Sequence, residues 1–76
     1  MPNDPRRAIV EALRATGLTQ RALGLRIGVS QPSVRDWLIG ATLPDAQSVR
    51  LIVAAFPQTL PLARVWWRNL AGEAGK

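Results

Sequence analysis

Arginine supplies most of the binding chemistry that this sequence offers. Ten of its 76 residues are Lys or Arg against five Asp or Glu, which gives a net charge of +5, and nine of the ten bases are arginine. The planar guanidinium fork matches phosphate groups and the edge of guanine. GC-rich codon usage also enriches arginine, but the excess of positive charge remains under either explanation. The composition therefore favours an anionic partner.

The side chains that most often carry enzymatic chemistry are missing. Cys, His and Tyr are absent, which excludes disulfides, the usual zinc sites and Ser-His-Asp catalysis. No carboxylates pair closely in the sequence, and no glycine-rich phosphate loop is found. We therefore expect no enzymatic activity, no metal and no cofactor. With neither a run of about 18 apolar residues nor a signal-peptide pattern, we expect a cytoplasmic protein without a membrane partner.

Helix breakers divide the chain into five short segments. The sequence predicts that the first four helices follow the capping residues Asp4, Thr19, Ser30 and Asp45 and end at Gly17, Gly28, Gly40 and Pro57. A loop over residues 58–61 is expected before a fifth helix, with a frayed tail over residues 72–76. No strand alternation or hairpin signal is found. The prediction is an all-α bundle of four to five short helices, with residues 1–76 as one domain.

The stretch from Thr19 to Gly40 carries the most specific pattern. Two short helices meet there through the turn Gly28-Val29-Ser30, and a turn of this length fixes a sharp angle between them. Glycine at its start adopts positive φ without a steric clash. Gly24 must be small, because a side chain there would push the helices apart. The expected apolar surface of this motif, completed from the first helix, comprises Ile9, Leu13, Leu23, Ile27, Val29, Val34 and Trp37.

This stretch resembles the helix-turn-helix of the lambda-type Cro and CI repressor family. It is also similar to Cro/YdaS-type prophage regulators. The resemblance rests on the string V-S-Q-x-x-V-x-x-W-L-x-G over residues 29–40, and on Gln20, Leu23, Gly24 and Ile27 before it. It covers roughly residues 6–56 and implies a lambda-repressor-like fold with its helix-turn-helix at residues 19–40. It also implies a homodimer that binds operator DNA and regulates transcription, as a repressor, in a phage or prophage.

The resemblance also implies roles for individual residues. Those expected to face bases are Gln31, Pro32, Ser33, Arg35 and Asp36, and those expected at phosphates are Gln20, Arg21, Arg26, Thr42, Arg6 and Arg7. Gln31 can present its amide to adenine, Arg35 can pair with guanine or phosphate, and Asp36 can accept from cytosine. Pro32 departs from the family pattern, which has a polar base-reading side chain at this position. It can contribute only shape or contact a thymine methyl group.

The pair Trp66-Trp67 in the fifth segment has no counterpart in the family pattern. Adjacent helical residues point about 100° apart, so one tryptophan is expected to pack against the fourth helix and the other to need a partner. Large exposed aromatic side chains mark interfaces. We therefore predict a dimer interface within residues 60–71, formed by Leu62, Val65, Trp66, Trp67 and Leu70. The alternative is a protein-binding module, such as an antitoxin-like partner, that uses the same segment.

Overall fold

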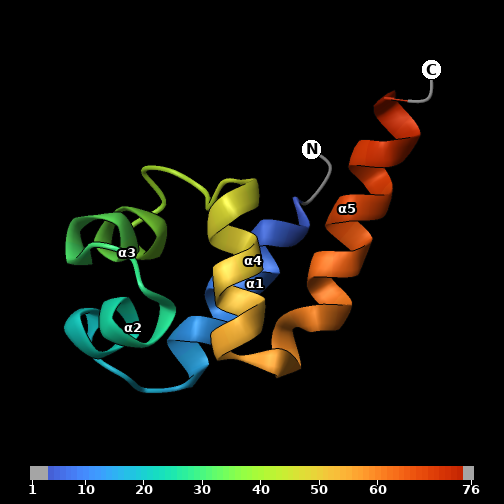
Figure 1. Ribbon diagram of the computed structural model, residues 1–76. Helices are drawn as coiled ribbons and strands as arrows, with labels where there is room; N and C mark the ends of the chain where they lie inside the picture. The colour runs from blue at the N-terminus through green and yellow to red at the C-terminus, as the bar shows by residue number, and fades with distance from the viewer. Residues whose placement is uncertain (1–3, 75–76) are drawn as a thin grey trace.

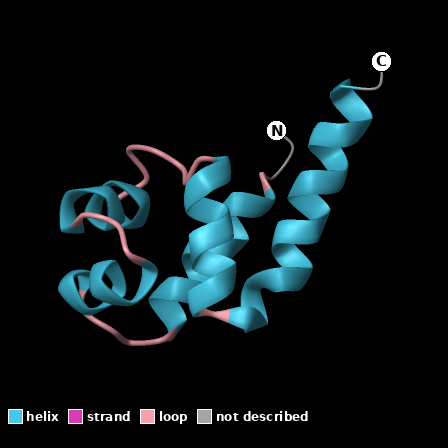
Figure 2. Ribbon diagram, in the orientation of Figure 1, coloured by secondary structure: helices cyan, strands magenta, loops and turns pink. Residues whose placement is uncertain are grey.

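The computed structural model describes residues 4–74, and within this range the chain is helical without a strand (Figure 2). The elements are α1 (Pro5–Ala15), α2 (Gln20–Ile27), α3 (Gln31–Leu38), α4 (Ala46–Ala55), the short 3-10 helix η1 (Pro57–Thr59) and α5 (Leu60–Ala74). The predicted all-α bundle of short helices is therefore confirmed.

A central pair of helices has further helices on two opposite sides (Figure 1). In the view of Figure 1, α1 and α4 lie in the middle, α2 and α3 lie together on one side, and α5 lies on the other. α5 packs mainly along α1, and its last turns extend past the rest of the bundle. No helix in the described part of the chain combines the length and apolarity needed to cross a membrane.

The predicted N-caps of the first four helices and the glycines after the first three are confirmed in atomic detail. Oxygen atoms of Asp4, Thr19, Ser30 and Asp45 each accept a hydrogen bond from a backbone N–H in the first turn of the following helix, at 2.9, 3.1, 3.3 and 2.8 Å respectively. The three glycines after α1, α2 and α3, Gly17, Gly28 and Gly40, adopt φ of 73°, 87° and 80°. Local chemistry therefore sets these boundaries.

The start and end of α5 differ from the sequence prediction. The segment expected to be a loop over residues 58–61 instead ends η1 and begins α5, with Pro61 in the first helical turn. A proline there loses no intrahelical hydrogen bond, since the first N–H groups of a helix have no partner. Thr59 is buried and donates its hydroxyl to the Phe56 carbonyl at 2.7 Å. The expected frayed tail is also wrong up to Ala74, where α5 ends; residues 75–76 lie outside the described range.

One hydrophobic core joins the helices. The side chains predicted for it from the first three helices are buried or, for Val29, half-buried. Trp37 is 5 % exposed, which confirms its prediction as a core residue. The rest of the core comprises Val49 and Ile52 of α4, Phe56 directly after it, and Ala63 and Trp66 of α5. Burial of this apolar surface is the main force that holds the short helices together.

Arg6 connects three parts of the fold. Its Nη1 donates to the carbonyl oxygen of Pro44, before α4, at 2.9 Å. Its Nη2 lies 2.7 Å from Oδ2 of Asp4. Its guanidinium carbon lies 5.0 Å from the centroid of the Trp66 ring, within the range of a cation–π contact. The side chain thus ties the start of α1 to the α3–α4 loop and to α5.

Gly24 permits the close packing of α2 against the following turn. A Cβ atom on residue 24 would lie 2.9 Å from the carbonyl oxygen of Val29, closer than real Cβ contacts allow, and 3.6 Å from the backbone nitrogen of Gln31. The oxygen belongs to the backbone and cannot rotate away. The predicted need for a small residue at position 24 is therefore confirmed, and the obstacle is the turn itself.

Acid should weaken the fold through Asp4. The side-chain hydrogen bond from Arg6 holds the pKa of Asp4 below its ordinary value of 3.8. The resulting stability is fully present above the unfolded-state pKa and is lost as the pH falls through the lowered folded-state value. We expect urea denaturation to show this loss as the pH falls from about 5 through the lowered pKa of Asp4. The Asp4→Asn variant should lose less over the same range; an equal loss in both proteins would contradict the assignment.

Replacement of Gly24 by alanine should destabilise the protein by about 1–3 kcal/mol, because the added methyl group forces the turn away from α2. Helix propensity alone predicts the opposite sign, since alanine favours a helix by about 1 kcal/mol over glycine. Urea denaturation of the wild type and Gly24→Ala measures the difference in unfolding free energy, and its sign shows whether the steric clash or the helix propensity dominates. An alanine variant as stable as the wild type would show that the turn yields without cost.

Candidate nucleic-acid interface

The α2–α3 pair presents its two N-termini side by side. Gly28 ends α2 in the left-handed conformation, and its N–H donates to the Gly24 carbonyl at 2.8 Å. The N–H of Val29 donates to the same oxygen at 3.1 Å. The chain then turns sharply into α3, whose first residue passes close to Gly24. This geometry brings residues at the start of α3 next to the first turn of α2.

Four of the predicted DNA-contacting residues line one shallow depression of about 190 Å³. Gln20 comes from the start of α2, and Gln31, Pro32 and Arg35 come from α3. Gln31, Pro32 and Arg35 are exposed, and Gln20 is half-buried. One residue predicted to meet phosphate and three predicted to meet bases therefore share one surface. An amide, a guanidinium and an apolar ring can together hold a base edge and a phosphate.

Ser33 and Asp36 are less exposed to solvent than the other residues predicted to face bases. Both are half-buried. The Ser33 hydroxyl lies 2.9 Å from the Ser30 hydroxyl, and the Ser33 N–H donates to that same oxygen at 3.3 Å. In the described residues, no ion pair engages the Asp36 carboxylate. Its backbone carbonyl accepts from the N–H groups of Ala41 and Thr42, at 2.9 and 3.3 Å, after the end of α3.

The predicted phosphate contacts divide into two groups. Arg21 and Thr42 are exposed at the start of α2 and after α3. Arg26, although exposed, lies at the other end of α2, with its guanidinium carbon 5.9 Å from the centroid of the Phe56 ring. Residues 24 and 26 point about 200° apart on a helix, so Arg26 faces away from the side of α2 that meets α3. The structure does not bring Arg26 to the depression.

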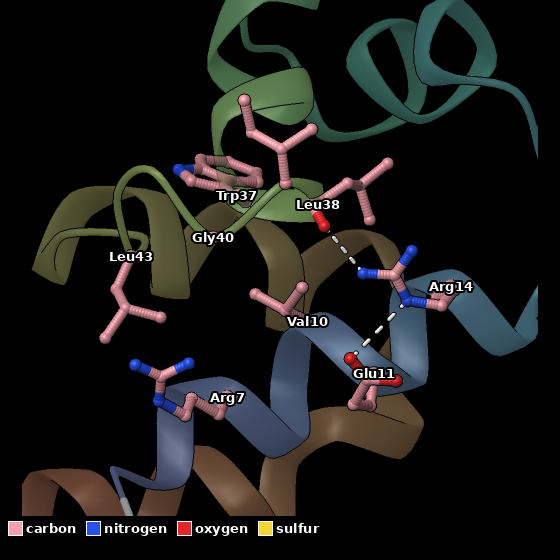
Figure 3. Close-up of a pocket in the computed structure, with 9 residues that line it drawn as sticks. Arg7, Val10, Glu11, Arg14, Trp37, Leu38, Gly40 and Leu43 are labelled. Carbon is pink, nitrogen blue, oxygen red and sulfur yellow. Dashed lines mark hydrogen bonds and ion pairs between the residues drawn. The ribbon is translucent and has the colours of Figure 1, made fainter.

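Arg6 and Arg7 also differ from each other. Arg6 is engaged within the protein by Asp4, Pro44 and Trp66, so its guanidinium is not free for phosphate as the sequence had suggested. The sequence spacing of Asp4 and Arg6 predicts only an ion pair between these two residues. It does not predict that Arg6 also contacts Pro44 and Trp66 on other elements. Arg7 is exposed and lines a cavity of about 170 Å³ between α1 and the end of α3 (Figure 3). That cavity shares no lining residue with the depression.

Arg14 holds the far end of α3, a role that the sequence analysis missed. Its Nη2 donates to the carbonyl oxygen of Leu38 at 2.7 Å, and its Nε lies 3.4 Å from Oε2 of Glu11 (Figure 3). The last carbonyl groups of a helix lack partners within the helix and attract cations. The spacing of Glu11 and Arg14 predicts a surface pair on α1, but nothing in it identifies the Leu38 carbonyl.

The structure separates the residues predicted for a dimer interface. Trp66 is 7 % exposed, shares the core with Val49 and Ile52 of α4 and lies beneath Arg6 of α1, so it has almost no surface for a second chain. Leu62 and Trp67 are half-buried against the core. Val65 and Leu70 are 43 % and 40 % exposed. They point about 140° apart around α5, so they do not form one stripe.

Comparison with known proteins identifies the family. A model of the helix-turn-helix family matches residues 9–62, which include α2, α3 and α4, most of α1 and the first residues of α5. No curated protein and no solved structure matches the chain. The match covers most of the sequence and agrees with the α2–α3 geometry, and therefore the chain belongs to the Cro/CI-type helix-turn-helix family of DNA-binding transcription regulators.

Proposed function

We propose that this protein is a sequence-specific repressor that places the start of α3 in the major groove of operator DNA. The observation that carries the proposal is the shared depression of Gln20, Gln31, Pro32 and Arg35 at the paired starts of α2 and α3. In this arrangement Gln20 and the backbone N–H groups at the start of α2 hold a phosphate, while Gln31 and Arg35 donate to base edges. Residues 1–76 act as one binding unit.

The charge distribution supports a polyanionic partner. Every arginine except Arg6 is exposed, and the net charge is +5. Arg21 near the start of α2 and Thr42 after α3 are placed by the proposal at phosphates that flank the groove. Such contacts release counterions, so affinity should fall steeply as salt rises. Arg6 and Arg26 are left out of the proposed interface, because Arg6 is engaged internally and Arg26 lies over Phe56.

A binding selection from a random duplex library, followed by sequencing of the bound DNA, tests this function. We expect enrichment of a short motif, and for Arg35→Ala a loss of about 1–3 kcal/mol together with a relaxed preference at one base pair. Gln20→Ala should weaken binding to all sequences alike. Arg64→Ala removes the same charge from exposed α5 and serves as the control. Equal behaviour of the Arg35 and Arg64 variants would remove α3 from the role of reading helix.

We also propose that two copies bind together, with half-sites about 34 Å apart. Leu70 and the half-buried Trp67 are two apolar residues of α5 that lie on neighbouring sides of the helix. They point about 60° apart on the helix, and they continue the face that Trp66 turns to the core. We propose that this pair of side chains forms the contact with the second chain. The alternative, an antitoxin-like protein-binding module, would use the same pair and would depend little on salt.

Sedimentation of matched variants tests the dimer. Leu70→Ser removes the proposed contact, and Val65→Ser is the control, since both side chains are similarly exposed in the monomer, at 40 % and 43 %. We expect Leu70→Ser to shift the protein to monomer and to abolish enrichment of paired half-sites, while Val65→Ser retains the dimer. A monomeric wild type at micromolar concentration, on and off DNA, would overturn the proposed dimer.

A further inference from the structure

The depression between α2 and α3 is lined mainly by apolar atoms and not by hydrogen-bonding groups. Its lining is mostly apolar, although three of the four lining residues, Gln20, Gln31 and Arg35, have polar side chains. Their methylene groups and the ring of Pro32 therefore form much of its surface. An apolar hollow on an exposed, basic surface is matched by an apolar group carried on a polyanion.

Pro32 provides no hydrogen-bond donor at its position in α3. It is the second residue of α3 and is exposed, and it has neither a backbone N–H nor a polar side chain. The neighbouring Ser33 hydroxyl is turned to Ser30, 2.9 Å away, so it does not fill the place of the missing donor. This part of the surface can therefore discriminate between bases by shape and apolar contact, and not by a hydrogen bond from residue 32.

The major groove of DNA exposes one apolar group. Among the four bases, only thymine carries a methyl group there, at C5, whereas cytosine carries hydrogen at C5 and an amine donor at C4. Arg35 lies three residues after Pro32, on the same side of α3, and lines the same hollow. A methyl group seated against Pro32 would bring the neighbouring base pair within reach of the Arg35 guanidinium.

We propose that the depression formed by Gln20, Gln31, Pro32 and Arg35 accepts the C5 methyl group of a pyrimidine, which is thymine in unmodified DNA, and that Arg35 reads the adjacent base pair. The inference rests on the proposed function, because it concerns DNA already held against α3. It makes Pro32 a specificity-determining residue through the methyl group that it contacts.

Replacement of thymine by uracil tests this assignment, because it deletes the methyl group and leaves base pairing intact. The DNA is the preferred duplex from the selection, with each thymine exchanged in turn and affinity measured by fluorescence anisotropy at fixed salt. We expect one thymine per half-site at which uracil weakens binding about fourfold, the effect of one buried methyl group. 5-Methylcytosine at that position should bind more tightly than unmodified cytosine.

Pro32→Ala locates the contact on the protein. Alanine is compatible with the second position of a helix but provides less apolar surface, so the difference between thymine and uracil should shrink towards onefold. Pro61→Ala is the matched control, since Pro61 is also an exposed proline at the second residue of a helix, α5. It should retain the full difference. Thermal unfolding of both variants checks that the fold is intact.

The outcomes separate the two proposals. Specific binding that no uracil substitution weakens would overturn the methyl site and leave the proposed repressor function standing. A uracil penalty that persists unchanged in Pro32→Ala would overturn the assignment of the contact to this depression. If the selection enriches no sequence, the proposed function and the methyl site fail together.

Discussion

The arrangement of the proposed DNA-binding surface on α2 and α3 depends on how closely the Val29 carbonyl approaches Gly24. The Gly24 carbonyl accepts hydrogen bonds from both Gly28 and Val29, so the turn is folded back onto the helix that precedes it. The Cβ atom of any side chain at position 24 would lie 2.9 Å from the Val29 carbonyl oxygen. This contact sets where α3 begins, and hence which residues of α3 stand beside Gln20. Without it the paired helix starts would separate.

The rest of the structure holds α3 in that position. Ser30 caps its first turn, Val34 and Trp37 are buried beneath it, and Arg14 of α1 bonds to the carbonyl of Leu38 at its end. A side chain that must meet a base edge needs a rigid support, because small displacements lose directional hydrogen bonds. The exposed residues Gln31, Pro32 and Arg35 thus project from a helix fixed at its start, middle and end.

Features set by neighbouring residues could be predicted from the sequence, and features set by distant ones could not. The caps at Thr19 and Ser30 and the glycine stops act within one helical turn, so spacing alone reveals them. The pattern around Gly24 reflects a contact five residues away and was also predictable. In contrast, Arg6 meets Pro44 and Trp66 across the fold, and no local pattern records this. The loop predicted around Pro61 is wrong because proline fits a loop and a first helical turn equally well.

The pairing of the first helix with the last has a consequence for synthesis on the ribosome. Arg6 of α1 lies over the ring of Trp66, yet Trp66 is made long after α1. At about 5–20 residues per second, several seconds pass between the two, whereas short helical units fold in far less than a second. The helices α2 and α3 therefore emerge and can pack first, and the side of α1 that receives α5 stays uncovered in the nascent chain. Any partner of this face at that stage, including a chaperone, must leave before α5 can dock.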